Sequence, residues 1–365
     1  MPQLPKTPNV VSSSSGSASA NSSLLAGVSM IAAISAFAAV NLSTTILAPV
    51  VCALFIIAIA WPMQKRLQSR LPKLIALAIV VATIAIAFAS FASLAVWALG
   101  RIGRWLAGDA ARLQGLYGQL AAWLEDHGIA LAGLWAEHFN MRWLMRVVQD
   151  LTGRLYTIAG FWLVVVVYVI LGLLEVDGTK RKLQGMTNQG VARALIDGAT
   201  ATSAKFRRYL LIRTVMSLAT GLLVWVIASI AGLQLALEWG VIAFVLNYIP
   251  FIGPFIATVF PTLFALAQFA SWQEALIVFV CLNIIQFVIG SYIEPRVAGN
   301  ALAVSPFVVL LSVFLWTFLW GGFGAFIGVP ITIAIVTFCA QHPSSRWLAD
   351  LLGAPVYTPS VDELR

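Results

Sequence analysis

The stretch that decides the fold is Asn247-Tyr248-Ile249-Pro250-Phe251-Ile252-Gly253-Pro254, which interrupts a hydrophobic run over residues 239–270. That run is long enough to cross a bilayer, for which a helix needs about 20 apolar residues. Each proline lacks a backbone N–H and clashes with the carbonyl four residues earlier, so the carbonyls of Leu246 and Pro250 lose their helical partners. In hydrocarbon no water replaces those partners, and the break therefore predicts a position against protein or a wet cavity.

Two interpretations of this break remain open. It is either a proline kink whose polar groups are satisfied by neighbouring helices, or a discontinuous helix that lines a substrate path, as in secondary transporters. The side-chain amide of Asn247, directly before the break, also needs hydrogen-bond partners. The second interpretation makes Asn247, Pro250, Gly253 and Pro254 candidate residues of the path.

The composition around this stretch sets the class of the protein. Of the 365 residues, 61% are hydrophobic and only 10% are charged, whereas soluble domains carry about 25% charged residues. Apolar runs of about 20 residues recur between residues 24 and 340, which predicts an all-α polytopic membrane protein. The net charge of +8 gathers in loops between these runs, so it indicates membrane orientation and argues against a nucleic-acid partner.

We predict about eight transmembrane helices, with three of them in residues 24–99 and a transport core in residues 154–345. The expected spans lie at about 24–40, 44–61, 74–99, 155–174, 214–231, 239–270, 275–293 and 304–340. Two of these, 239–270 and 304–340, exceed the length of a simple span and contain breaks. The sequence leaves open whether each is a kinked span or a re-entrant hairpin.

Basic residues predict the orientation of the chain. The connection after the second span carries Lys65, Arg66, Arg70 and Lys73 without an acidic residue, and residues 175–213 form the most basic loop. An excess of lysine and arginine marks cytoplasmic loops. Both loops are therefore expected in the cytoplasm, together with a disordered tail over residues 1–23 and a second tail over residues 346–365.

Residues 100–153 differ from the rest of the chain because their arginines are balanced by acidic residues. Leucines and aromatic residues recur there at about helical spacing, which predicts amphipathic helices outside the membrane. The absence of a basic bias places this segment on the extracytoplasmic side.

A second break, Gly321-Gly322-Phe323-Gly324-Ala325-Phe326-Ile327-Gly328-Val329-Pro330, lies in the last long run. Each glycine lowers helix stability by about 1 kcal/mol relative to alanine. Gly324 and Gly328 also form a face of small residues suited to close helix packing. Packing and a hinge or gate role both remain open, and Gly321, Gly324, Gly328 and Pro330 are the candidate residues.

A charged pair, Glu294-Pro295-Arg296, ends the seventh expected span, and Arg296 is the only basic residue between Thr214 and Ser345. A charged residue at the centre of a span costs about 2.5–3.5 kcal/mol on insertion scales. Proline biases the residue before it toward an extended conformation, in which alternate side chains share one side. The pair is either a solvated loop feature or a gate that presents both charges together beside the first break.

The sequence contains no constellation that indicates covalent chemistry. Cys52, Cys281 and Cys339 lie in separate hydrophobic runs and the three histidines are scattered, so we expect no metal, cofactor or enzymatic activity. The uncharged polar residues of the apolar core indicate recognition of an uncharged polar substrate, and they are Asn247, Gln268, Asn283 and Gln286.

Three motifs in this order resemble the autoinducer-2 exporter family of transporters. They are Asn247–Pro254, Ile293-Glu294-Pro295-Arg296-Val297-Ala298-Gly299, and Leu319-Trp320-Gly321-Gly322-Phe323-Gly324 followed by Val329-Pro330. The resemblance covers about residues 24–340 and adds Gly299 to the candidate site. It implies a homo-oligomeric protein of the bacterial inner membrane, in a family whose members export autoinducer-2 or exchange sodium for protons.

We therefore predict a permease that exports a small polar solute or signalling molecule through the discontinuous helix. A sodium(lithium)/proton antiporter is an alternative, but it needs intramembrane carboxylates, for which only Glu294, Glu238 and Glu274 are available. A non-transporting membrane scaffold is the third hypothesis, and residues 101–153 would then be its active part.

Overall fold

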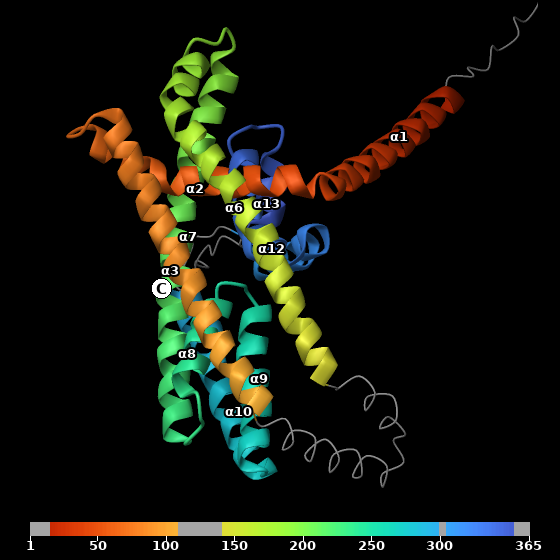
Figure 1. Cartoon of the computed structure of the whole chain (residues 1–365). Coiled ribbons are helices and arrows are strands. Elements are labelled where there is room, and N and C mark those ends of the chain that lie inside the picture. The colour runs from red at the N-terminus through yellow and green to blue at the C-terminus, as the bar shows by residue number, and fades with distance from the viewer. Residues whose placement is uncertain (1–14, 109–140, 299–303, 354–365) are drawn as a thin grey trace, which may run out of the picture. The chain divides into compact units, whose positions relative to one another are not determined.

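The computed structural model describes residues 15–108, 141–298 and 304–353, and in these ranges the chain is helical without a strand (Figure 1). Within this described part, seven helices are long and apolar enough to cross a membrane. A shorter apolar helix covers Gly27–Leu42. The prediction of an all-α polytopic membrane protein is confirmed. Most of the expected extracytoplasmic segment lies outside the described residues.

The chain divides into two units, residues 1–48 and residues 49–365. The first unit contains α1 (Ser15–Leu42) and the start of α2 (Thr44–Gln68). Helix α1 begins inside the segment that we expected to be a disordered tail, so this expectation is wrong for residues 15–23. The segment leads directly into an apolar helix, and extending an existing helix is much easier than starting a new one.

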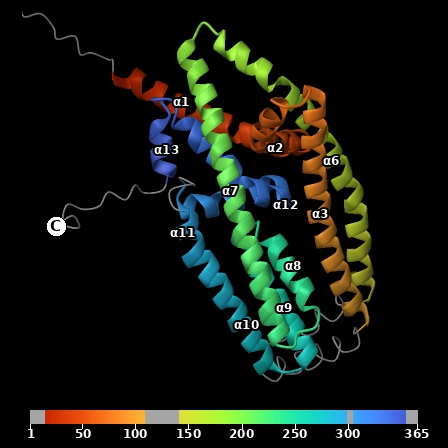
Figure 2. The same ribbon diagram turned by 90° about the vertical axis from the view of Figure 1, so that its left-hand side faces the viewer.

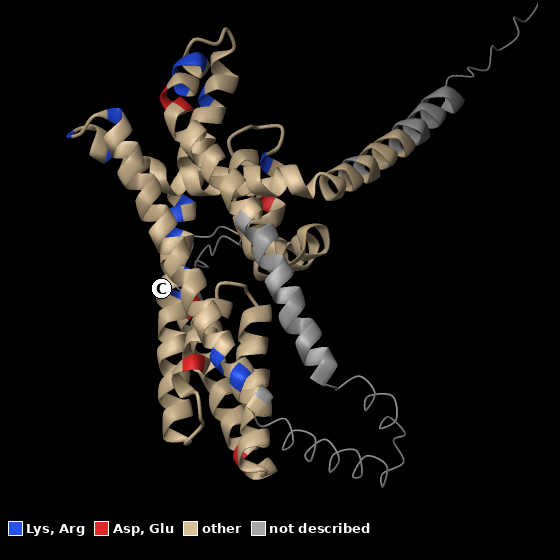
Figure 3. Cartoon of the chain, viewed as in Figure 1, with Lys and Arg blue, Asp and Glu red and all other residues tan. Residues whose placement is uncertain are grey.

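The basic segment 175–213, which the sequence predicts as a connection between two spans, consists of the end of one long helix, four linking residues and the first part of the next helix. Helix α3 (Lys73–Gly108) precedes α6 (Met141–Gln184), and α7 (Gln189–Ile230) follows after four residues. Asn188 caps α7 by accepting a hydrogen bond from the backbone N–H of Val191. Figure 3 shows lysine and arginine gathered where α6 meets α7. The basic residues show where the chain leaves the apolar region. They do not show where a helix ends, because lysine and arginine are good helix formers.

The run over residues 239–270 folds back on itself as two helices, α8 (Ala236–Leu246) and α9 (Ile252–Phe269) (Figure 2). The Gln268 side chain accepts a hydrogen bond from the backbone N–H of Gln234 at 2.7 Å and donates one to the carbonyl of Gly232 at 2.9 Å. These contacts bring the start of α8 beside the end of α9. We call this helix pair hairpin 1 (residues 236–269), and its geometry is that of a re-entrant hairpin rather than a kinked span.

The following helix is continuous through the charged motif. Helix α10 (Trp272–Phe287) passes into a π-helical turn (Val288–Ile293) and then into α11 (Glu294–Ala298). Glu294 is helical, with φ −57° and ψ −48°, so the expected extended conformation before Pro295 is wrong. The π-helical turn stands directly before the proline, where the missing N–H already interrupts the ordinary helical pattern.

Helix α12 (Pro306–Cys339) also reverses direction, at Trp320 and Gly321. Gly321 has φ 62° and ψ −145°, a conformation that is open essentially to glycine alone. The hydroxyls of Ser312 and Thr332 lie 2.7 Å apart, although 20 residues of straight helix would separate them by about 30 Å. Residues 306–339 therefore form hairpin 2, which is followed by α13 (Arg346–Leu352).

Glycine allows the two arms of each hairpin to approach closely. A Cβ atom at Gly253 would overlap the carbonyl of Leu246 in the opposite arm of hairpin 1. A Cβ atom at Gly324 would likewise overlap the carbonyl of Trp316 in hairpin 2, and one at Gly328 would lie 2.9 Å from the Trp316 Cβ. Gly324 and Gly328 thus face a neighbouring helical arm, as expected for a packing role.

The two hairpins approach the middle of α7 from its opposite ends. Hairpin 1 begins directly after the C-terminal end of α7, and Phe338 near the end of hairpin 2 packs against Gly198 in the N-terminal half of α7. Near the two turns, the rings of Tyr248 and Phe326 have centroids 6.5 Å apart. The turns therefore meet, while the open ends of the hairpins point away from each other.

The re-entrant geometry predicts that Thr187 and Gln273 lie on opposite sides of the membrane, because α7 crosses once and hairpin 1 returns to its side of entry. A kinked span over residues 239–270 would instead place both positions on the same side. After replacement of Cys52, Cys281 and Cys339, single cysteines at the two positions are tested with a membrane-impermeant thiol reagent in intact cells. Reaction at one position alone is the expected result, and equal protection or equal reaction would contradict it.

The glycine packing predicts different outcomes for two neighbouring glycines of hairpin 2. Gly324→Ala should lower the unfolding free energy by about 1–3 kcal/mol, because the new methyl group overlaps the Trp316 carbonyl. Gly322→Ala is the matched control, since a Cβ there meets open space, and its effect should stay within about 1 kcal/mol. Thermal unfolding of the purified protein in detergent measures both, and equal effects would contradict the hairpin packing.

Candidate functional site

The turn of hairpin 1 satisfies the backbone groups that its prolines leave unpaired. The Leu246 carbonyl accepts a hydrogen bond from the Ile249 N–H at 2.9 Å, and the Pro250 carbonyl accepts one from the Ile252 N–H at 2.7 Å. The second bond closes a turn around Phe251, which has φ 62° and ψ −52°. This is the geometry of the classic γ-turn, which is rare and strained, and such strain costs about 1–3 kcal/mol.

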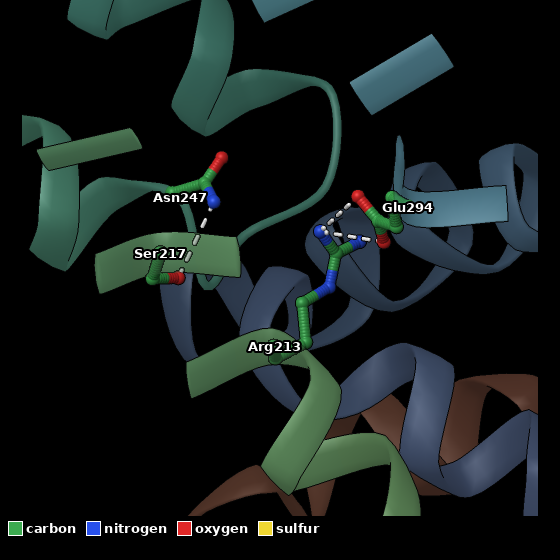
Figure 4. A network of polar contacts seen from close by, with 4 residues as sticks. All are labelled: Arg213, Ser217, Asn247 and Glu294. Carbon is green, nitrogen blue, oxygen red and sulfur yellow. Dashed lines mark hydrogen bonds and ion pairs between the residues drawn. The ribbon is translucent and has the colours of Figure 1, made fainter. Parts of the chain in front are cut away.

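Two adjacent side chains attach this turn to α7. Asn247 Nδ2 donates to Ser217 Oγ at 3.3 Å, and the Tyr248 hydroxyl donates to Thr214 Oγ1 at 3.0 Å (Figure 4 for the first pair). Asn247 and Ser217 are both buried. Thr214 and Ser217 are three residues apart and so lie on neighbouring turns of one helix face. The amide that sequence analysis singled out thus has a specific partner in another helix.

Aromatic rings surround the same turn. The ring of Tyr248 packs edge-to-face against Phe91 of α3 and Phe244 of α8, with centroids 5.3 Å and 5.7 Å away. On another side it meets Phe326 of hairpin 2. Tyr248 therefore links four helical elements, since its hydroxyl bonds to α7 while its ring contacts three others.

A buried ion pair lies beside the turn. Arg213 Nη1 is 3.0 Å from Glu294 Oε1 and 3.2 Å from Glu294 Oε2 (Figure 4). The two side chains are only 9% and 19% exposed. Arg213 precedes Thr214 in α7, so the ion pair and the bonds of the turn occupy adjacent positions of that helix. Each charge in this environment depends on its partner, because an unpaired buried charge is strongly unfavourable.

The expected pairing of Glu294 with Arg296 is wrong. Arg296 is exposed, and its guanidinium carbon lies 4.0 Å from the centroid of the Tyr292 ring. The helical backbone explains this, because residues two apart do not face each other on a helix. Sequence analysis missed Arg213 because it stands at the edge of the basic segment. Arg213 and Ser217 are four residues apart and therefore share one helix face. This spacing was the signal that could have added Arg213 to the predicted site.

The structure brings only part of the predicted site together. Asn247 and Glu294 meet around α7, and the buried Pro250 and Gly253 shape the turn with Pro254. The remaining predicted residues of the site are distributed as follows: Gly321, Gly324, Gly328 and Pro330 in hairpin 2, Gln286 partly buried in α10, Pro295 in α11, and Gly299 outside the described residues.

The other polar candidates lie away from this cluster. Gln268 closes the open end of hairpin 1, and Asn283 is exposed and donates to the carbonyl of Phe279 in its own helix. Glu238 is buried and pairs with Arg101 of α3 at 2.8 Å. Glu274 is exposed in the first turn of α10. The polar site is therefore centred on the turn of hairpin 1 and the middle of α7.

A cavity of about 350 Å³ between α2, α3 and α6 does not suit a polar solute. Its walls are apolar side chains such as Ile56, Val81, Phe88 and Trp162. Among the described residues, no group of three or more His, Cys, Asp or Glu side chains is arranged to hold a metal ion. The polar cluster around α7 remains the candidate site.

Comparison with known families agrees with this architecture. The model of a family described as AI-2E family transporter matches residues 27–343. The chain belongs to this family. The chain is accordingly a multi-pass membrane transporter, and the resemblance predicted from the three motifs is confirmed.

Individual relatives support the same assignment. The chain is 29% identical to the AI-2 transport protein TqsA of Escherichia coli (strain K12) over 319 residues, which are 86% of this chain and 91% of that protein. It is 34% identical over 191 residues to the putative transport protein YhhT of Escherichia coli (strain K12), covering 52% of this chain and 54% of the relative. A putative transport protein of Borreliella burgdorferi is 33% identical over 174 residues, 47% of this chain and 48% of that protein.

The buried ion pair predicts strong coupling between Arg213 and Glu294. Arg213→Met and Glu294→Met should each lower the unfolding free energy by about 3–5 kcal/mol, because each leaves one buried charge without its partner. The double variant should regain most of that loss, since it buries no charge. Thermal unfolding in detergent measures all three variants.

Arg296→Met is the control for this cycle, because that side chain is exposed and its contact with Tyr292 is worth about 0.5–1 kcal/mol at such a site. Losses that simply add in the double variant would show that Arg213 and Glu294 do not act as a pair.

Proposed function

We propose that the chain exports a small polar solute from the cytoplasm across the bacterial inner membrane, along a path at the turn of hairpin 1. One observation carries this proposal. Side chains from hairpin 1, α7 and the α10–α11 junction converge in the interior at a point where the helix is broken. Broken helices at such a point are how secondary transporters expose polar groups to a substrate.

The chemistry of this cluster suits an uncharged solute with hydrogen-bonding groups. A polar solute that leaves water needs replacement donors and acceptors, because an unpaired polar group in an apolar environment is costly. Asn247, Ser217, Tyr248 and Thr214 offer both kinds of group. The charge of Arg213 is balanced by Glu294, so the cluster as a whole provides polarity without net charge.

Autoinducer-2 is the first solute to test, because the Escherichia coli relative that aligns over most of its length is named as an AI-2 transport protein. We also propose that both termini face the cytoplasm and that the chain works as a homo-oligomer. Hairpin 2 has a place in this mechanism, since Gly321 reverses its chain and Phe326 contacts the turn of hairpin 1. A hinge at Gly321 would move that contact.

Sodium–proton exchange is less well supported by the geometry. Two carboxylates of the described core are engaged by arginine, the partly buried Glu294 by Arg213 and the buried Glu238 by Arg101. A carboxylate that binds cations and protons in turn must be free to exchange its partner. The two pairings therefore favour the export of an uncharged solute.

Replacement of one asparagine in each of two locations tests the proposed path. Asn247→Leu should reduce the initial rate of autoinducer-2 uptake into everted membrane vesicles at least about tenfold, the effect of losing 1.4 kcal/mol of interaction. Asn283→Leu should transport normally, because Asn283 is exposed and bonds only to its own helix. Equal rates for the two variants, at equal protein levels, would remove the turn of hairpin 1 from the path.

The same vesicles distinguish the two classes of transport. Uptake is measured with and without imposed proton and sodium gradients, and a pH-sensitive dye reports proton movement after addition of Na⁺ or Li⁺. Solute uptake without cation-dependent proton release is the expected result. Proton release on addition of Na⁺ or Li⁺, without uptake of autoinducer-2, would replace the proposal by antiport.

A further inference from the structure

A line of buried polar side chains runs along one face of α7. Its members are separated by seven, four, four and three residues, so the 3.6-residue repeat places all of them on the same face. We call this line the α7 polar stripe, and it consists of Thr202, Tyr209, Arg213, Ser217 and Thr220. Each of these residues is at most 7% exposed. Only Arg213 and Ser217 belong to the site described above.

The stripe contains polar atoms that have no hydrogen-bond partner among the described residues. They are Thr202 Oγ1, the Tyr209 hydroxyl, Arg213 Nε and Thr220 Oγ1. A buried threonine in a helix commonly bonds to the carbonyl four residues earlier, as Thr214 does with Leu210. Thr202 and Thr220 do not form such bonds. Each unsatisfied buried group costs about 1–3 kcal/mol, so four along one line of one helix indicate a ligand that satisfies them.

The two ends of the stripe lie near contacts with the two hairpins. Next to Thr220, Gly221 packs against Phe244 of α8 in hairpin 1. At the other end, Thr202 lies one turn from Gly198, which contacts Phe338 of hairpin 2. The 18 residues between Thr202 and Thr220 correspond to about 27 Å of helix.

The opposite face of α7 has the reverse character. Leu211, Leu218 and Leu222 are 64%, 62% and 53% exposed, as expected for side chains in contact with lipid. The helix therefore directs its polar groups inward and its apolar groups outward. In membrane proteins this arrangement is typical of helices that face a bundle interior or a water-filled cavity.

We infer that the α7 polar stripe binds a continuous file of water molecules, which extends from the turn of hairpin 1 in both directions along α7. Water supplies both donors and acceptors, so it satisfies the hydroxyls of Thr202 and Thr220 and the N–H of Arg213 alike. The file passes the Arg213–Glu294 pair and lowers the cost of burying its charges. This inference concerns water access alone and does not depend on which solute is transported.

Cysteine substitution along α7 tests this inference without a transport assay. After Cys52, Cys281 and Cys339 are replaced by alanine, Thr202→Cys and Thr220→Cys are exposed to silver ion in open membrane fragments. Thiols that remain free are then counted with a fluorescent maleimide after denaturation. Silver ion reaches thiols only through water, and it is small enough to enter a narrow file.

Two matched controls define the background. Leu218→Cys faces the apolar surroundings of the same helix, and Val169→Cys lies in a dry apolar cluster with α2 and α3. A thiol in an apolar environment has a raised pKa, and each pKa unit lowers the reactive thiolate tenfold. The stripe cysteines should therefore react at least about tenfold faster than both controls. Rates equal to those of the controls would overturn the inference.

Valine substitutions provide a second test if a cysteine variant does not insert normally. Thr202→Val and Thr220→Val keep the shape of the side chain and remove only the hydroxyl. If the hydroxyls are hydrated, the melting temperature should fall or stay unchanged. If the hydroxyls are dry and unsatisfied, their removal should raise the melting temperature, and a rise in both variants would overturn the inference.

Discussion

Backbone hydrogen bonding at the proline break is the constraint on which the rest of the structure depends. Pro250 and Pro254 cannot serve as donors, and hydrocarbon offers no water in their place. The chain solves this by turning, so that Ile249 and Ile252 bind the carbonyls that a continuous helix would leave unpaired. The turn then has to lie among other helices, and α3, α7 and hairpin 2 surround it.

A second reversal occurs in hairpin 2, where Gly321 takes the conformation that turns the chain back. In both hairpins a glycine of the returning arm lies against a backbone carbonyl of the first arm. The two reversals enter from opposite ends of α7 and meet at Tyr248 and Phe326. The turn of hairpin 1, with the polar side chains of Asn247 and Tyr248, is thereby held among other helices. This is the arrangement that a transporter needs to offer hydrogen bonds to a solute away from bulk water.

Charged residues lie mainly outside the apolar stretches of the chain, and two carboxylates of the described core are paired. Most basic residues lie where α6 meets α7 and between α2 and α3, and Figure 3 shows few charges around α8–α10. The partly buried Glu294 and the buried Glu238 each have an arginine partner. A buried pair of this kind contributes little net stability but makes the loss of either member severe. The Arg213–Glu294 pair therefore specifies how the α10–α11 junction docks on α7, and it leaves the site polar and uncharged.

The sequence by itself determined the membrane class, the positions of both breaks and the family, because run length, proline and glycine act locally along the chain. It predicted that Asn247 needs a partner, and it offered close packing as one of two roles for Gly324 and Gly328. It did not determine that both long runs fold back, since a kinked span and a hairpin share the same local breaks. It predicted residues 175–213 as a connection between two spans, but the charges there did not show where the two helices end and begin. Only the tertiary structure decided that Glu294 pairs with Arg213, 81 residues away, and not with Arg296. Packing of distant helices decides such a contact, whereas sequence patterns report only neighbours along one helix.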